Sequence, residues 1–273
     1  MRLLRAAPLL LAVFALPAAA QRLPYDNVLD AEHRVGPRLT YASLLDEPQL
    51  KPAPVEAAEG EESEPVRALY GDRLEWRPQR GADAYNWDVS AEIGSARHRL
   101  WLATTGDGLI GGPLEYFETQ ALYSRPLAGS GLALQAGVRR DFVPRPRRSY
   151  AVLGIQGNVS DPLYVGAFGF LSHRGEFTGR AFAYYDLPLT ERLILQPALE
   201  TEIAVADVPE LGIGAGPVYG EAGLRLRYTF ADALAPYVGV NWERLTGRTA
   251  RMARTAGDDL ETTSLVLGIR SYF

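Results

Sequence analysis

Acidic and arginine side chains recur at alternate positions within otherwise apolar segments of the chain. Glu200 and Glu202 alternate with leucine, threonine and isoleucine, and Arg225 and Arg227 alternate with leucine and tyrosine. Because successive side chains of a strand point to opposite faces, these residues are predicted to share one polar face. The positions predicted to lie on this face are Arg73, Glu75, Asp88, Glu92, Glu118, Arg139, Asp141, Arg180, Asp186, Glu200, Glu202, Glu221, Arg225, Arg227, Glu243 and Arg270.

Two kinds of chemistry fit this polar face. Arginine bridges carboxylates through paired hydrogen bonds, which predicts an ion-paired filling of a closed interior. The set nevertheless has ten acids and six arginines, and rings of Asp and Glu favour cations. A structural plug and a narrow, cation-preferring passage both remain open, and one molecule can combine them. The aromatic residues predicted to share the face are Trp101, Phe168, Phe170, Phe182 and Tyr184.

Strands separated by turns are the elements that would position these side chains. The last nine residues, LVLGIRSYF, alternate apolar with small or polar residues and end in an aromatic one, which is typical of the closing strand of an outer-membrane barrel. The pattern predicts a transmembrane β-barrel of twelve antiparallel strands within residues 67–273. The strands are expected at about 67–77, 83–94, 98–107, 114–125, 131–142, 149–158, 163–172, 177–187, 192–205, 219–230, 235–245 and 261–273.

Loop lengths agree with an even number of strands and a carboxy-terminus in the periplasm. The segments 206–218 and 246–260 are long and are predicted to lie outside, whereas the connections on the other side are short. Pro197 removes one hydrogen-bond donor from its strand, so a bulge or local irregularity is expected there. Aromatic girdles facing the lipid are expected from Trp87, Tyr123, Tyr185, Tyr228, Trp242 and Phe273.

The first 66 residues differ in composition from the rest. Residues 1–20 combine Arg2 and Arg5 with an apolar core and an Ala-Ala-Ala cleavage site, which predicts a signal peptide. Residues 21–66 are rich in proline and glutamate and are predicted to be a disordered periplasmic tail. The chain has no cysteine, and its net charge of −5 argues against nucleic-acid binding. No later stretch is apolar for long enough to form a transmembrane helix.

Metal-ligating and catalytic candidates are few. His173 and Met252 fall in two predicted external loops and are the candidates for a metal site, although a single histidine in a loop is usually only solvated. Acidic residues in the loops, among them Asp207 and Asp258, supply hard oxygen donors that suit Ca²⁺ better than copper. Ser172 and His173 are adjacent, so their side chains would diverge in a strand, and this arrangement does not predict a hydrolase.

Several blocks of sequence resemble a known family. In order they are ALYSR (121–125), QAGVRRDF (135–142), YDLPLTERLILQPALE (185–200), DVPELGIG (207–214), LRLRY (224–228) and APYVGVNWER (235–244). Together they are similar to the copper-resistance protein B family, the outer-membrane components of periplasmic copper-resistance systems. The resemblance implies an outer-membrane barrel that works beside a periplasmic multicopper oxidase.

The resemblance also implies what the barrel acts on. We expect a monomer that contributes to copper resistance or homeostasis by limiting, passing or retaining copper ions at the cell outer membrane, in contact with lipid and lipopolysaccharide. Many relatives carry a Met- and His-rich segment before the barrel, whereas this region here has His33 and no methionine. We therefore expect no tightly bound cofactor, with copper ions as the candidate ligand, and no enzymatic activity. The alternative is a general narrow cation channel, or a structural barrel, without copper specificity.

Overall fold

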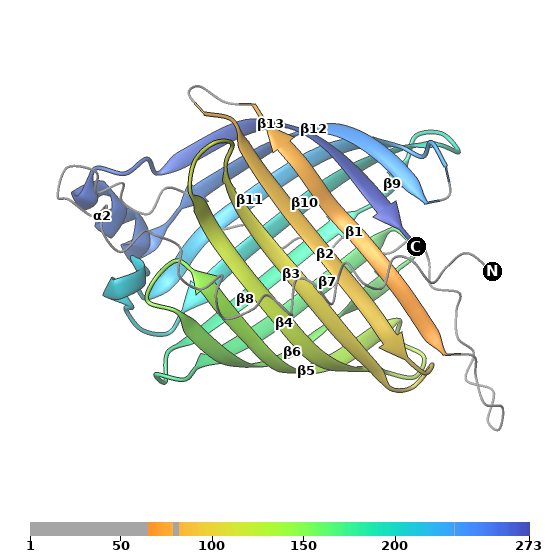
Figure 1. Ribbon diagram of the computed structural model, residues 1–273, viewed down its shortest axis with the longest axis horizontal. Coiled ribbons are helices and arrows are strands. Elements are labelled where there is room, and N and C mark those ends of the chain that lie inside the picture. The colour runs from red at the N-terminus through yellow and green to blue at the C-terminus, as the bar shows by residue number, and fades with distance from the viewer. Residues whose placement is uncertain (1–64, 79–81, 232) are drawn as a thin grey trace. The chain divides into compact units, whose positions relative to one another are not determined.

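The computed structural model describes residues 65–78, 82–231 and 233–273. The predicted signal peptide and nearly all of the predicted tail lie outside the described residues. The described residues form a β-barrel, in which the chain runs up and down through consecutive antiparallel strands (Figure 1).

Each strand of the barrel pairs with its neighbour in sequence, and β1 pairs with β13 to close the sheet. The two-residue β9 continues the line of β8 beside β10, so the thirteen labelled strands occupy twelve positions. The predicted closed twelve-stranded barrel is therefore confirmed. The strands are β1 (Val66–Arg77), β2 (Ala84–Gly94), β3 (Arg99–Leu109), β4 (Leu114–Pro126), β5 (Leu132–Val143), β6 (Arg148–Ser160), β7 (Leu163–Ser172), β8 (Phe177–Tyr185), β9 (Leu187–Pro188), β10 (Leu193–Ala204), β11 (Gly216–Tyr228), β12 (Leu234–Leu245) and β13 (Glu261–Tyr272).

The barrel has a polar interior and an apolar exterior. On β10, Glu200 and Glu202 are buried inside, whereas Leu199, which precedes Glu200, is 63% exposed on the outer wall. The same alternation leaves Val138 and Leu153 about as exposed as Leu199. This inverts the arrangement of a water-soluble protein and matches a wall that faces lipid. Of the expected girdle residues, Tyr123, Tyr185, Tyr228, Trp242 and Phe273 are exposed and Trp87 is half-buried.

Pro197 interrupts a ladder without changing its register. On one side, β10 pairs with β11 continuously through Pro197 and Leu224. On the other side, β10 pairs first with β9 and then with β8, and pairing is interrupted at Asp186 between them. The two ladders share one register. The expected irregularity is therefore a gap in hydrogen bonding, which is what the missing N–H group of proline requires.

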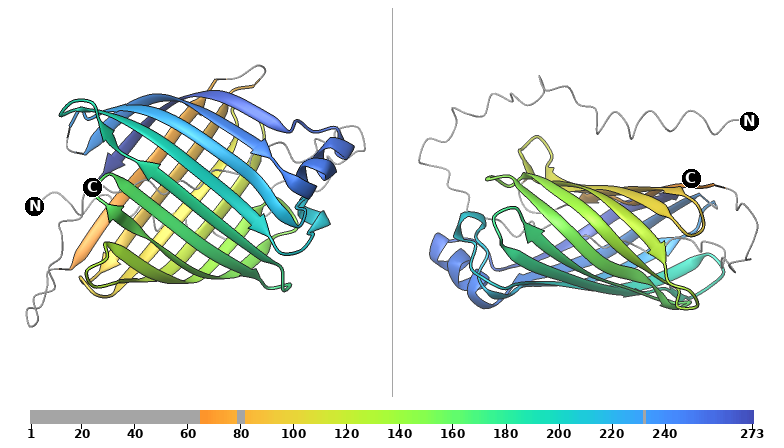
Figure 2. Two further views of the ribbon diagram at one scale, coloured as in Figure 1. Left: turned by 180° about the vertical axis from the view of Figure 1, so that it is seen from behind. Right: turned by 90° about the horizontal axis from the view of Figure 1, so that it is seen from below.

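The two ends of the barrel differ. At one end, which we call the terminal end, β1 begins and β13 ends, and the connections between strands are short turns (Figure 2). The opposite end, the α2 end, carries the 3₁₀ helix η3 (Pro209–Leu211) and the helix α2 (Gly247–Ala256). Sequence reasoning predicted plain loops at both places. No helix in the described part of the chain is long and apolar enough to cross a membrane.

Contacts with the barrel hold α2 in place through one face of this amphipathic helix, whose sequence is GRTARMARTA. Thr249 and Ala253 are the buried residues of the helix, and the Gly214 N–H donates to the Thr249 hydroxyl at 2.9 Å. A Cβ atom at Gly214 would lie 2.6 Å from the Thr249 backbone nitrogen, so this close approach requires glycine. Arg248 pairs with Asp207 of the facing loop at 2.5 Å. The helix thus combines an amphipathic sequence with close contacts to the loop 205–215.

Candidate functional site

The lumen is lined by charged side chains with an excess of acids. Among the described residues, eleven carboxylates and seven arginines are buried. All the residues predicted to share the polar face are buried, except Asp186, which is half-buried towards the terminal end. The structure adds Asp72, Asp107 and Arg148 to the predicted set. The third strand was predicted to end at residue 107, and the sixth was predicted to begin at residue 149. Asp107 and Arg148 therefore lay at the edges of predicted strands, where their facing was not assigned.

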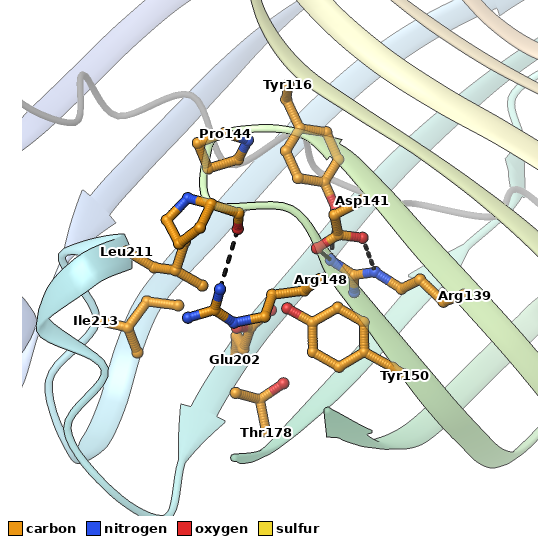
Figure 3. Close-up of a pocket in the computed structure, with 11 residues that line it drawn as sticks. Tyr116, Arg139, Asp141, Pro144, Arg148, Tyr150, Thr178, Glu202, Leu211 and Ile213 are labelled. Carbon is orange, nitrogen blue, oxygen red and sulfur yellow. Dashed lines mark hydrogen bonds and ion pairs between the residues drawn. The ribbon is translucent and has the colours of Figure 1, made fainter. Parts of the chain in front are cut away.

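Arg139 on β5 organises one group of lumen charges. Its guanidinium donates to both carboxylate oxygens of Asp141, at 2.7 and 3.0 Å, and lies 2.7 Å from Glu118 on β4. It also donates to the Tyr116 hydroxyl, which in turn donates to Glu118. Figure 3 shows Tyr116, Arg139 and Asp141 facing the same small cavity. Two neighbouring strands are thereby joined inside the barrel by charge-assisted hydrogen bonds.

Arg180 on β8 organises a second group with β10 and β11. It lies 3.1 Å from Glu202 and 3.8 Å from Glu200. The Tyr219 hydroxyl also donates to Glu200. Arg180 and Arg139 both lie over the ring of Phe170, at 5.3 and 4.8 Å from its centroid, so cation–π contacts join the two groups.

Glu75 on β1 is the acceptor of a third group, which reaches over β13 to β12 and β11. Arg225 on β11 donates to it at 3.0 Å, Tyr237 on β12 donates at 3.0 Å, and Arg77 of its own strand approaches to 2.8 Å. The Tyr237 ring reaches this position by crossing Gly268, where a Cβ atom would lie 2.4 Å from the ring. These contacts connect β1 with the strands that close the barrel.

Further ion pairs lie towards the terminal end. Arg227 pairs with Asp186 at 2.9 Å, and Gln196 donates to the same carboxylate at 2.7 Å. Arg99 pairs with Glu92 at 3.0 Å. At 3.6 Å, Arg270 on β13 approaches Asp72 on β1 beside the closing ladder. The Thr105 hydroxyl donates to Asp88 at 3.4 Å.

Stacked aromatic rings occupy the wall formed by β6, β7 and β8. Phe182 stacks on Phe168 and on Tyr184, with ring centroids 6.3 and 5.9 Å apart. The rings lie directly over glycines of the adjacent strands, because a Cβ atom at Gly154 or Gly166 would fall 2.1 Å from a ring carbon. All five aromatic residues predicted to point inward are buried. Rings and ion pairs together leave little free volume along this wall.

Three buried carboxylates form no direct ion pair with the rest of the described chain. Asp107, Glu221 and Glu243 are 3%, 2% and 5% exposed, and no other described residue forms an ion pair with them. Both carboxylate oxygens of Asp107 and of Glu221, and Oε1 of Glu243, have no hydrogen-bond partner among the described residues. The acidic excess of the lumen is therefore concentrated at this place.

Arg148 joins the barrel wall to the loops of the α2 end. It is 1% exposed, donates to Glu176 at 2.8 and 3.0 Å, and donates to Glu210 of η3 at 2.8 Å. Its guanidinium also donates to the Pro146 carbonyl, as Figure 3 shows. Arg174 reaches Glu210 from the neighbouring turn at 2.7 Å. Because Arg148 and Glu210 are 62 residues apart, strand alternation gives no signal for this contact.

These contacts shift the acidity of the two glutamates. Hydrogen bonds from Arg148 and Arg174 lower the pKa of Glu210. Partial burial opposes ionisation of Glu176, but hydrogen bonds from Arg148 and Ser172 outweigh it, so the pKa of Glu176 is lowered as well. Both carboxylates are therefore ionised and paired over a wide pH range.

The two metal candidates occupy different elements of the α2 end. His173 is exposed in the turn between β7 and β8, where its Nδ1 accepts a hydrogen bond from the Ser149 N–H. Met252 is half-buried on α2. In the part of the chain that the structure describes, no group of three or more His, Cys, Asp or Glu side chains is arranged to hold a metal ion.

Sequence comparison decides the family. The family model described as copper resistance protein B precursor matches residues 66–273, which is the entire barrel. The chain belongs to the copper resistance protein B family. The family predicted from the ordered sequence blocks is confirmed. The family and the barrel fold together indicate the outer membrane.

Individual relatives agree with this assignment. A copper resistance protein B homolog of Pseudomonas syringae pv. tomato is 39% identical over 202 residues, which is 74% of this chain and 68% of the relative. Copper resistance protein B of Escherichia coli is 36% identical over the same shares of the two chains. Among solved structures, the NanC porin superposes with a TM-score of 0.50 and 13% identity, covering 76% of this chain and 99% of the porin, which shows the shared barrel fold.

Proposed function

We propose that this protein contributes to copper resistance by letting copper ions pass, or holding them, inside a narrow and negatively charged barrel in the outer membrane. The observation that carries the proposal is the excess of buried carboxylates over arginines, eleven to seven among the described residues, in a member of the copper resistance protein B family. An interior with this charge attracts cations and repels anions. The protein in this proposal is a monomeric channel or retention site without enzymatic activity.

The proposed orientation puts the terminal end in the periplasm and the α2 end outside the cell. Outer-membrane barrels have short periplasmic turns and longer external loops. The connections at the terminal end, such as 161–162 and 189–192, are short, whereas 205–215 and 246–260 at the α2 end are long. In this orientation the tail before β1 would extend into the periplasm, where it could meet a multicopper oxidase. The outer wall would contact lipid, and the α2 end lipopolysaccharide.

Side chains restrict what could pass. The cavity lined by Tyr116, Arg139 and Arg148 has a volume of about 30 Å³, room for one or two water molecules. The ion-paired groups around Arg139, Arg180 and Glu75 also project into the lumen from the strands that they join. Small ions accompanied by few waters therefore fit this interior, and larger nutrients do not.

The lumen chemistry favours cations in general over copper in particular. Its side-chain ligands are carboxylates, amides and hydroxyls, which are hard oxygen donors, whereas soft thioether ligands would select Cu(I). Met252 and His173 lie at the α2 end, outside the ion-paired groups of the lumen. The link to copper thus rests on the family, and selection of copper would be left to partner proteins.

Deletion of the gene tests the proposal directly. We expect the deletion strain to grow more poorly than its parent as copper sulfate is increased, and to differ from it in cell-associated copper measured by elemental analysis. A plasmid carrying the full chain should restore both. Unchanged growth and unchanged copper content across the whole concentration range would refute the proposal.

A structural barrel without transport is the second candidate, and the ion-paired interior favours it. Ion pairs such as Arg139 with Asp141 and Arg225 with Glu75 lock strands together, which an open channel does not require. Conductance of the purified protein in planar lipid bilayers separates the two functions. Cation-selective current supports passage, whereas zero current under every cation gradient supports the structural barrel.

A further inference from the structure

We propose that Glu221 and Glu243, with Asp107 facing them, form a binding station for one hydrated divalent cation within the lumen. The inference rests on the proposed function and deepens it, because it names the place where a passing or retained cation would be held. The three residues lie in the halves of β11, β12 and β3 that are nearer the α2 end.

The register of the sheet places like charges side by side. Glu200 on β10 is the direct partner of Glu221 on β11, and Glu221 is the direct partner of Glu243 on β12. Directly opposed residues of antiparallel strands have Cα atoms about 4.5–5.5 Å apart, and like charges in such pairs are destabilising. A row of three carboxylates on adjacent strands therefore requires positive charge nearby.

Protein cations neutralise only part of this row. Arg180 approaches Glu200 at 3.8 Å, and the Tyr219 hydroxyl donates to the same carboxylate. Arg73 also acts on Glu200. Arg77 acts on Glu221, Glu243 and Asp107, but its guanidinium is hydrogen-bonded to Glu75 at 2.8 and 3.0 Å. Glu221 and Glu243 thus lack a hydrogen-bonded counterion among the described residues. Burying an uncompensated carboxylate is costly unless it takes up a proton or a cation, and one cation beside the row would neutralise neighbouring carboxylates together.

Two buried amide side chains beside these carboxylates also have atoms without hydrogen-bond partners in the described chain. Asn86 is the cross-strand partner of Asp107 and is 2% exposed, and neither its amide nitrogen nor its oxygen has a hydrogen-bond partner among the described residues. Asn241 precedes Glu243 by two residues on the same face, is 3% exposed, and its Oδ1 likewise accepts no hydrogen bond. Buried polar groups without protein partners are completed by water or ions. These amides can therefore bind the water shell of a cation that the carboxylates attract.

The spacing favours a hydrated ion over a bare one. In the described chain no three acidic or histidine side chains come together closely enough to hold a metal ion directly. An ion at this place would keep much of its water and be held mainly by charge. Loose binding suits passage, because an ion must be held strongly enough to enter and weakly enough to leave.

Titration of the purified full-length protein in detergent with Cu²⁺ tests the station. We expect calorimetry to detect one ion per chain, and the electron paramagnetic resonance spectrum of the bound ion to show oxygen ligands without nitrogen splitting. The double variant Glu221→Gln with Glu243→Gln should bind Cu²⁺ about tenfold more weakly or worse. The matched control Glu191→Gln removes an exposed carboxylate from a turn and should leave binding unchanged.

Measurements of the unfolding temperature test the inference even if the double variant does not fold correctly. Cu²⁺ should raise the unfolding temperature of the unmodified barrel, because a ligand that binds only the folded state stabilises it. That rise should be absent in Glu221→Gln alone. The inference is overturned if the unmodified protein binds no ion, if the glutamine variants bind as it does, or if nitrogen splitting assigns the ion to histidine. These results would leave the growth test of the proposed function unaffected, and a negative growth test would leave the station intact.

Discussion

Arg225 of β11 donates a hydrogen bond to Glu75 of β1 at 3.0 Å, although the two residues are 150 positions apart in sequence. Both side chains are almost completely buried. The pair connects β1 to β11 along the inner face of the wall, over the two intervening strands β13 and β12. It therefore supports closure independently of the β1–β13 ladder.

Replacement of Glu75 by glutamine should destabilise the barrel. The change leaves Arg77 and Arg225 buried without their shared carboxylate, and breaking a buried ion pair costs about 3–5 kcal/mol. Urea unfolding in lipid vesicles, followed by the mobility shift between folded and unfolded protein in electrophoresis, measures the free energy of unfolding. Glu191→Gln on an exposed turn should change it by less than about 0.5 kcal/mol. Equal stability of the two variants would show that the Glu75 group is unimportant for folding.

Neutralising Glu200 and Glu202 together should reduce the preference for cations over anions. The double glutamine variant removes two lumen carboxylates and leaves Arg180 without its acidic partners. Under a potassium chloride gradient across a planar bilayer, the reversal potential should move towards the value for chloride. An unchanged reversal potential would contradict permeation through this part of the lumen.

The loops of the α2 end should loosen in acid. The pKa values of Glu176 and Glu210 are lowered in the folded protein, so their contribution to stability is complete above the ordinary glutamate pKa of about 4.3. It is lost as the pH falls through the lowered values, because protonation breaks the pairs with Arg148. Amide hydrogen exchange in residues 205–215, corrected for its intrinsic pH dependence, should therefore accelerate below about pH 4.

The variant Glu210→Gln provides the control for this acid response. It lacks one carboxylate of the group, so exchange in the loop should already be faster at neutral pH and should rise less on acidification. If the unmodified protein and the variant respond alike, the contact between Arg148 and Glu210 does not hold the loop.

An arginine on the outer wall should oppose membrane insertion. Leu199 is 63% exposed in the middle of β10, and arginine on the lipid face costs about 2–4 kcal/mol at the bilayer midplane. Folding of Leu199→Arg into lipid vesicles, measured by urea titration, should show this loss. Glu191→Arg in an exposed turn introduces the same side chain and should have little effect. A comparable result for both variants would argue that Leu199 does not face lipid.

Strand alternation was sufficient to predict the barrel and the facing of its charges. The period of two in segments such as 192–205 places Glu200 and Glu202 inside and Leu199 outside, whatever the neighbouring strands are, because the pleat of a strand fixes the direction of each side chain. The even number of strands followed from the lengths of the connections. The family was recognised from ordered blocks of sequence, most of which lie on strands, whereas DVPELGIG (207–214) lies in the loop that contains η3.

The tertiary structure decided which charges meet. Alternation puts Glu75 and Arg225 on one face but contains no information about their contact, which depends on closure of the barrel and on the register of the strands between them. Alternation likewise could not reveal that Glu221 and Glu243 are direct cross-strand neighbours, because this follows from the register of β11 and β12. Nor could it reveal that carboxylate oxygens of both lack hydrogen-bonded partners among the described residues. The contact of Arg148 with Glu210 joins segments 62 residues apart, so local periodicity could not reveal it. Helix α2 is a short amphipathic segment that was overlooked within a predicted loop.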